Sequence, residues 1–204
     1  VCCVDTETLL IAGGFNEYNY WDPRCGFLNP VSGELEEIQH LPFSHPSLIM
    51  MNYTPIGTGG VIYAVCFTQR QNEIIYKVGV YNHGATSVPF ENKKWTQMTI
   101  TVASTARLAQ KLAIIPLEDS RISIIHPNLA TADLLDLKNQ SGTKVEIKES
   151  ILWSRHLLVV HHGDAAYLTS DTKEKVFVYD KESHVVTTED LLAVKAVKEL
   201  PKRQ

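Results

Sequence analysis

The sequence predicts an all-β fold, namely a β-propeller of about four four-stranded blades. One observation is that apolar residues alternate with polar residues at a period of two, as in residues 76–81 and 175–179. Another is that a pair of strands followed by a turn recurs four times along the 204 residues. A repeat of about 40–50 residues built from strands is typical of propellers and strand arrays.

The repeated unit is an apolar strand, a loop, and a second strand that ends at an Asn or Asp. The expected first strands are residues 9–14, 61–66, 121–125 and 165–168, and their partners are residues 26–29, 79–82, 134–136 and 177–180. The closing residues are Asn29, Asn82, Asp136 and Asp180, at intervals of 53, 54 and 44 residues. Asn and Asp favour turns because their side chains bond to nearby backbone N–H groups.

These repeats divide the chain into a propeller over residues 1–190 and a tail over residues 191–204. The predicted blades cover residues 1–45, 46–100, 101–149 and 150–190. A short helix is expected near residues 105–112, which are rich in good helix formers. The tail is also expected to be helical, with Thr188 as its cap and acidic residues in its first turn.

The first repeat contains Ile11-Ala12-Gly13-Gly14, and the second closes on Trp95. With residues 176–180, these stretches resemble kelch-type β-propellers, and residues 27–42 also resemble the propellers attached to F-box proteins. The resemblance implies that the paired glycines allow strands to pass closely. It also implies that large aromatic residues pack between blades, in this sequence Tyr63, Tyr81, Trp95, Tyr167 and Tyr179.

Four blades are fewer than the six or seven of most kelch relatives, so the resemblance favours part of a larger propeller. The chain also starts without Met inside an expected strand, residues 1–4, which suggests a fragment. A closed four-bladed ring is the alternative. An open arc would expose two apolar sheet faces, because repeats bury their cores against their neighbours.

The best candidate for partner binding is the loop around Tyr18, Tyr20 and Trp21, where aromatic and short polar residues alternate. Such residues are common in protein-recognition loops. Packing of this loop against the first blade is the alternative. Arg155 is a second candidate, because exposed Arg often anchors an interface. An ion pair between blades would also explain it.

Metal or cofactor chemistry has weak support. His156, His161 and Asp164 lie near one another in sequence and are possible ligand types. Adjacent His161 and His162 would diverge on a strand, however, and residues 162–164 fit a hairpin turn. Residues 57–60 lack the Lys-Ser/Thr ending of a phosphate loop, and no G-x-S-x-G motif is present. We therefore expect no metal and no cofactor, and an enzyme is the less favoured class.

Charge and cysteines set expectations about partners and location. A net charge of −4 argues against nucleic acid, and no stretch reaches the roughly 20 apolar residues that span a bilayer. The cysteines form no C-x-x-C pair and are expected to be reduced, with Cys2, Cys3 and Cys66 buried. This favours an intracellular protein, cytoplasmic or nuclear. Sequons at Asn52 and Asn139 keep secretion as an alternative.

The function predicted from these patterns is a non-catalytic protein-interaction module or scaffold. Substrate recognition in a ubiquitin ligase and a subunit of a larger assembly are two forms of it. The alternative is a propeller enzyme or lectin for a sugar-like ligand, with His156, His161 and Asp164 near the pocket. A third hypothesis is a structural subunit whose propeller is completed by neighbouring chains.

Overall fold

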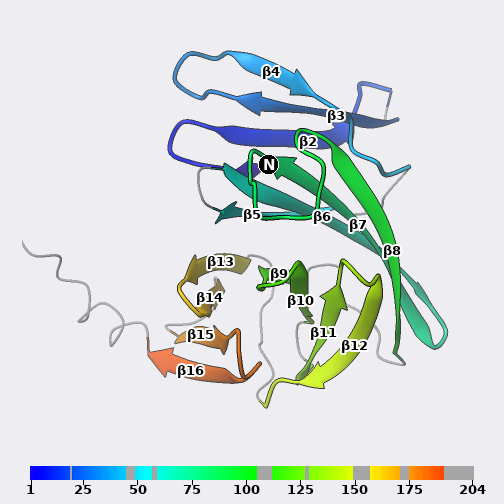
Figure 1. Ribbon diagram of the computed structural model, residues 1–204, viewed down its shortest axis with the longest axis vertical. Helices are drawn as coiled ribbons and strands as arrows, with labels where there is room; N and C mark the ends of the chain where they lie inside the picture. Colours follow the sequence, from blue (N-terminus) through cyan, green and yellow to red (C-terminus); the bar gives the residue numbers. More distant parts are fainter. Residues whose placement is uncertain are drawn as a thin grey trace, which may run out of the picture.

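The computed structural model describes residues 1–18, 20–44, 49–56, 59–104, 112–126, 129–148, 157–170 and 175–190. These residues form four four-stranded antiparallel sheets and no helix (Figure 1). The prediction of an all-β fold with four four-stranded, propeller-like blades is therefore confirmed. In this part of the chain no helix is long and apolar enough to cross a membrane.

Each sheet is a meander whose strands follow one another in sequence order. Blade 1 contains β1 (Cys2–Cys3), β2 (Leu9–Phe15), β3 (Trp21–Leu28) and β4 (Leu35–Ile38). Blade 2 contains β5 (Met50–Ile56), β6 (Gly59–Arg70), β7 (Glu73–His83) and β8 (Trp95–Ala103). Blade 3 contains β9 (Ala113–Pro116), β10 (Arg121–Ile125), β11 (Thr131–Asp136) and β12 (Ser141–Glu146). Blade 4 contains β13 (Leu157–His162), β14 (Ala165–Ser170), β15 (Lys175–Asp180) and β16 (Val186–Asp190).

The sequence repeat corresponds to the second and third strands of every blade. Its four closing residues accept a hydrogen bond from a backbone N–H two or three residues further on. The acceptors are Asn29, Asn82, Asp136 and Asp180, and the donors, at 2.7–2.8 Å, are Val31, Ala85, Asn139 and Ser183. These Asx turns begin the connection to the fourth strand, so the same side-chain chemistry redirects the chain in each blade.

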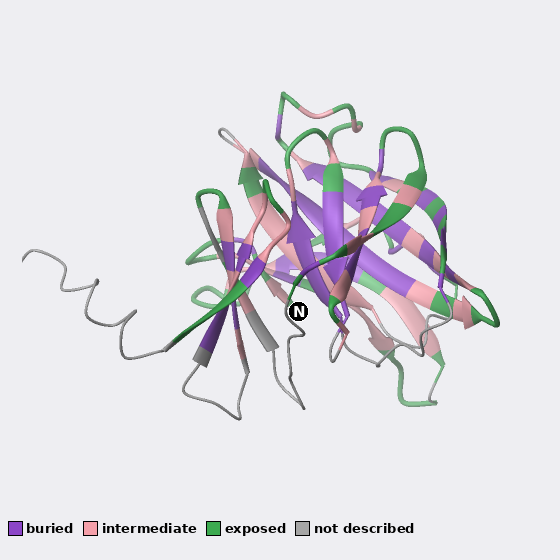
Figure 2. Ribbon diagram, turned by 90° about the horizontal axis from the view of Figure 1, so that it is seen from below, coloured by how far each residue is buried: buried purple, intermediate pink, exposed green. Residues whose placement is uncertain are grey.

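The blades follow one another in chain order, and the first strand of each blade contacts the first strand of the next. Strand β1 contacts β5, β5 contacts β9, and β9 contacts β13. In Figure 1 the blue sheet of blade 1 and the orange sheet of blade 4 lie at the two ends of this series. Buried residues concentrate where neighbouring sheets face each other, as the purple segments of Figure 2 show.

The core between blades 1 and 2 is built from aromatic and aliphatic side chains of both sheets. Leu10 and Phe27 pack there with Tyr81 and Trp95. The Trp95 indole Nε1 donates to the Gln39 carbonyl at 2.9 Å, which ties blade 2 to the chain that follows β4. Trp95 thus packs between blades, as the resemblance implies.

Both paired glycines have a positive φ, +66° at Gly13 and +159° at Gly14, but only Gly13 is closely packed. Its φ of +66° lies in the left-handed region, and a Cβ there would come within 2.3 Å of the Trp21 ring. Gly14 has open space around it, so close approach explains one glycine of the pair and not the other.

The predicted start of the C-terminal helix at Thr188 is wrong, and most of both predicted helices lies outside the described residues. Thr188 and Glu189 belong to β16, where Thr188 is paired with Phe177 of β15. A helix therefore does not begin at Thr188, because the β-branched run Val186-Thr187-Thr188 pairs as an edge strand. Residues 105–111 and 191–204 are outside the described part of the chain.

Blades 2 and 3 are joined by a buried polar cluster as well as by apolar packing. Tyr76 of β7 donates its hydroxyl to Asp133 Oδ2 of β11 at 2.6 Å. His126 Nε2 lies 2.9 Å from the same oxygen and 3.2 Å from the Tyr76 hydroxyl. Lys144 Nζ lies 3.9 Å from Asp133 Oδ1. Tyr76, His126 and Asp133 are completely buried, and these contacts replace part of the hydration that the groups lose on folding. His126 Nδ1 and Asp133 Oδ1 have no hydrogen-bond partner.

We expect Tyr76→Phe to lower the free energy of unfolding by about 1–3 kcal/mol, because a buried carboxylate loses one of its donors. Urea titration followed by tryptophan fluorescence measures this change. Tyr20→Phe is the matched control, since the Tyr20 ring is exposed and the same hydroxyl is removed. Equal losses in the two variants would contradict the importance of the buried contact.

Candidate functional site

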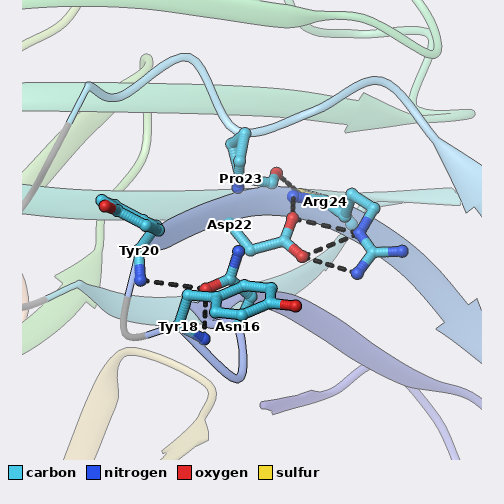
Figure 3. A network of polar contacts seen from close by, with 7 residues as sticks. Asn16, Tyr18, Tyr20, Asp22, Pro23 and Arg24 are labelled. Atoms are coloured by element: carbon cyan, nitrogen blue, oxygen red, sulfur yellow. Dashed lines mark hydrogen bonds and ion pairs between the residues drawn. The ribbon is translucent and has the colours of Figure 1, made fainter.

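The loop between β2 and β3 displays two of the predicted binding residues. The side chain of Asn16 shapes the loop, because its Oδ1 accepts the backbone N–H groups of Tyr18 and Tyr20, each at 3.0 Å (Figure 3). The Tyr18 and Tyr20 residues are 71% and 68% exposed. The loop therefore holds its backbone internally and presents both tyrosines to solvent.

Trp21, the third predicted residue of this loop, has a different environment. Its indole Nε1 donates to the Phe43 carbonyl at 3.1 Å, and its ring lies against Gly13. The Phe15 ring meets it edge-on, with centroids 6.0 Å apart. Trp21 is half-buried and anchors the base of the loop, which corresponds to the packing alternative predicted for it.

An ion pair lies beside this loop on β3. Arg24 Nη2 and Nε donate to Asp22 Oδ2 at 2.6 and 2.8 Å (Figure 3). These hydrogen bonds hold the pKa of the Asp22 carboxyl below its usual value. The Arg24 side chain is exposed and Asp22 is half-buried, so the pair adds a fixed polar contact next to the exposed aromatic residues.

The face of blade 1 that points away from blade 2 forms a second feature of the site. We call it the open face of blade 1 and define it by Ile11, Phe15, Gly26, Leu35 and Glu37. These residues line a groove of about 340 Å³. Leu35 is 54% exposed and Phe15 is 64% exposed, and Leu35 lies over Gly26, where a Cβ would come within 2.7 Å of it. The sequence analysis expected two exposed apolar sheet faces in an open arc but did not name their residues, although the alternation of inward Leu10 with outward Ile11 was the signal for this one.

A larger pocket of about 690 Å³ lies at the turns of blades 3 and 4 and beside β5 of blade 2. We call it the turn pocket. Its lining comes from the β9–β10, β13–β14 and β15–β16 turns, with Thr54, Ile56 and Tyr63 of blade 2 on the other side. In the β9–β10 turn Asp119 and Ser120 both have left-handed φ angles, +55° and +59°. This is the backbone of a tight hairpin turn, and it brings Glu118 and Arg121 together at the pocket.

One wall of the turn pocket is fixed by a hydrogen-bonded tyrosine. Tyr179 of β15 donates to Ser123 Oγ of β10 at 2.9 Å, and its hydroxyl lies 2.8 Å from His184 Nδ1. Burial raises the pKa of Tyr179 to about 12. Burial, together with the nearby Arg121 guanidinium, lowers the pKa of His184, so its imidazole is neutral at pH 7. The wall is therefore uncharged and joins blade 3 to blade 4.

The remaining predicted site residues are only partly within the described structure. Arg155 and His156 lie outside it, as do the side chains of His161 and His162, whose backbone is in β13. Gly163 and Asp164 form the expected hairpin turn between β13 and β14, and Asp164 is exposed at the turn pocket. Within the described ranges, no group of three or more His, Cys, Asp or Glu side chains is arranged to hold a metal ion.

The four cysteines are free thiols with different exposures. Cys25 and Cys66 are buried, and burial raises the pKa of Cys25 to about 11, so this thiol stays protonated. Cys3 is exposed, so the prediction that it is buried is wrong. The reason is that β1 is a two-residue strand at the edge of blade 1, and only one face of it meets a neighbouring blade.

Comparisons with known proteins give a structural likeness and no sequence family. No protein-family model matches the sequence, and no curated protein matches it either. The structure of apo AztD from Citrobacter koseri is similar with a TM-score of 0.42 and 12% identity, over 89% of this chain and 46% of that chain. A crystal structure of Citrobacter koseri AztD gives a TM-score of 0.39 and 12% identity, over 87% and 45%. This chain thus spans less than half the length of these solved chains.

We expect the free energy of unfolding to fall between pH 10 and pH 12, in part through Tyr179. Its folded pKa of about 12 lies above the unfolded value near 10, so its contribution is complete below pH 10 and is lost as the pH rises toward 12. The loss at pH 11 is about 1 kcal/mol for this residue. Urea titrations at a series of pH values should give a shallower alkaline decline for Tyr179→Phe. An unchanged decline, equal to that of Tyr20→Phe, would contradict this assignment.

Proposed function

We propose that this chain is a non-catalytic protein-interaction module that binds a partner through the open face of blade 1 and the adjoining β2–β3 loop. The observation that carries the proposal is the group of exposed apolar side chains at this place. Phe15 and Leu35 are more than half exposed, and Ile11, Tyr18 and Tyr20 are exposed beside them. Contiguous exposed apolar surface commonly marks a protein interface, and Tyr is enriched in such contacts.

The geometry of this face favours another β-sheet as the occupant. The opposite face of the same sheet packs on blade 2 through Leu10 and Phe27. Propeller sheets pack face to face around an axis. The sheet at either end of the series therefore has one face that no neighbouring blade covers. Blade 4 also exposes Val160 of β13. We therefore propose that a neighbouring subunit supplies a blade and completes a larger propeller.

A finer assignment rests on the sequence resemblance. The positions of Gly13 and Trp95 support a kelch-type propeller, and with it a role in substrate recognition for a ubiquitin ligase or in a scaffold. Four free cysteines support an intracellular location. The net charge of −4 supports protein rather than nucleic acid as the partner.

We expect a variant carrying both Ile11→Asp and Leu35→Asp to recover at least tenfold less partner than the unmodified chain. A charge on each side chain would have to be desolvated in the interface, and truncated hot-spot residues typically cost this much. The measurement is quantitative capture of crosslinked complexes by the tagged full chain from cells that express it. A second variant, with Tyr18→Ala and Tyr20→Ala, tests the loop separately.

Val31→Asp is the control for this experiment, because Val31 is apolar and 85% exposed but lies in the β3–β4 turn, away from the open face of blade 1. It should leave recovery unchanged. Circular dichroism and urea titration verify that each variant is folded. Equal recovery with the Ile11/Leu35 variant, the tyrosine variant and the Val31 control would contradict the proposed surface.

A further inference from the structure

We propose that the open face of blade 1 is covered by blade 4 of a second copy of this chain, so that two copies form one closed propeller of eight blades. This names the subunit that completes the propeller, and it therefore rests on the proposed function. The contacts between blades inside the chain define what each end of the series fits.

The four closing residues give every blade the same positions on its third strand. In blade 2, Tyr81 comes just before the closing Asn82 and packs in the core shared with blade 1, whereas Val80 packs in the core shared with blade 3. In blade 3, Leu135 comes just before the closing Asp136 and packs in the core shared with blade 2. The last residue before the closing residue thus faces the preceding blade, and the residue before it faces the following blade.

Blades 1 and 4 follow the same rule on the sides where they have a neighbour. Phe27 is in the position that faces the following blade, and its ring meets Tyr81 of blade 2 edge-on, with centroids 6.1 Å apart. Tyr179 is in the position that faces the preceding blade, and it donates to Ser123 Oγ of blade 3 at 2.9 Å. The Phe27–Tyr81 contact also shows that these two positions meet across a blade interface.

Leu28 of blade 1 and Val178 of blade 4 occupy the two positions that are left over. Leu28 stands where a preceding blade would pack, and Val178 stands where a following blade would pack. Both are half-buried, and among the described residues neither packs in a core shared with another blade. Because these are the positions that meet in the Phe27–Tyr81 contact, Val178 of one copy fits against Leu28 of another.

The neighbours of these two residues extend each position into an apolar row across the sheet. The row on the open face of blade 1 consists of paired leucines, namely Leu9, Leu28 and Leu35. The row on the outer side of blade 4, which we call the end face of blade 4, consists of Val160, Tyr167 and Val178. Neither row contains a charged side chain, so the two rows can pack together without burying an unpaired charge.

Two is the number of copies that closes such a ring. A single copy does not close on itself, because Ile11 and Leu35 of the open face remain exposed in the structure. A contact between two unlike faces builds a ring when the rotation closes, and propellers have about 4–8 blades. Two copies of four blades reach the upper end of this range, and three copies exceed it.

A second copy also covers both ends of the series with one kind of contact. A partner that supplied a single blade would cover the open face of blade 1 and leave the end face of blade 4 exposed. An unrelated protein would need two different surfaces to cover both. In a two-copy ring each copy brings the matching face for either end, so every sheet gains a neighbour on each side.

Sedimentation velocity of the purified full chain, over a range of concentrations, tests this proposal. We expect a species of twice the chain mass. Leu28→Asp in the open face and Val178→Lys in the end face of blade 4 should each weaken self-association at least tenfold, because a charge would lose its hydration in the contact. Val31→Asp is the control, since Val31 is exposed in a turn away from both faces, and it should leave the two-copy species intact.

A mixture of the two charged variants tests the pairing of unlike faces. In a mixed pair one contact joins two unchanged faces, and the other places the introduced carboxylate opposite the introduced ammonium. We expect the mixture to associate at least fivefold more tightly than either variant alone, and no gain on mixing would overturn the proposal. Circular dichroism verifies folding. Ile11→Asp, at a side chain that is already 39% exposed, serves in place of Leu28→Asp if that variant does not fold.

The outcomes separate this proposal from the proposed function. A chain that stays monomeric at every concentration would overturn the two-copy ring. If the Ile11/Leu35 variant then still loses a captured protein of another sequence, the open face of blade 1 remains an interaction surface. Self-association that persists undiminished in both Leu28→Asp and Ile11→Asp would overturn the two-copy ring and the proposed surface together.

Discussion

The face-to-face packing of amphipathic sheets is the constraint on which the rest of this structure depends. Residues alternate across each strand, so every blade has two faces, and each face needs a neighbour if it is apolar. Blades 2 and 3 have a sheet on both sides, and the core residues where they face each other are at most 6% exposed. Blade 1 uses Leu10 and Phe27 toward blade 2 and leaves Ile11 and Leu35 on its other face. The candidate interaction surface is thus a direct consequence of the architecture.

Buried polar groups add specificity to this apolar packing. Tyr76 and Asp133 join blade 2 to blade 3, and Tyr179 and Ser123 join blade 3 to blade 4. Each contact crosses a sheet interface and leaves the blades one favourable register, because a shifted sheet would leave the polar groups unpaired.

The two surfaces of interest lie in different parts of the blades and have different chemistry. The open face of blade 1 is a sheet face with aromatic and aliphatic side chains, and it suits a broad, apolar contact. The turn pocket is formed where strands reverse, and its charged side chains come from three separate turns.

The sequence by itself determined the fold class and the number of blades, because strand alternation and the turns at Asn29, Asn82, Asp136 and Asp180 are local properties. It also determined that Tyr18 and Tyr20 belong to a polar loop. Only the tertiary structure decided that Trp21 packs inward and that Ile11 and Leu35 are the residues on the uncovered face of blade 1. These features depend on which sheets meet and which turns converge. Such contacts join residues far apart in the chain, and no local pattern encodes them.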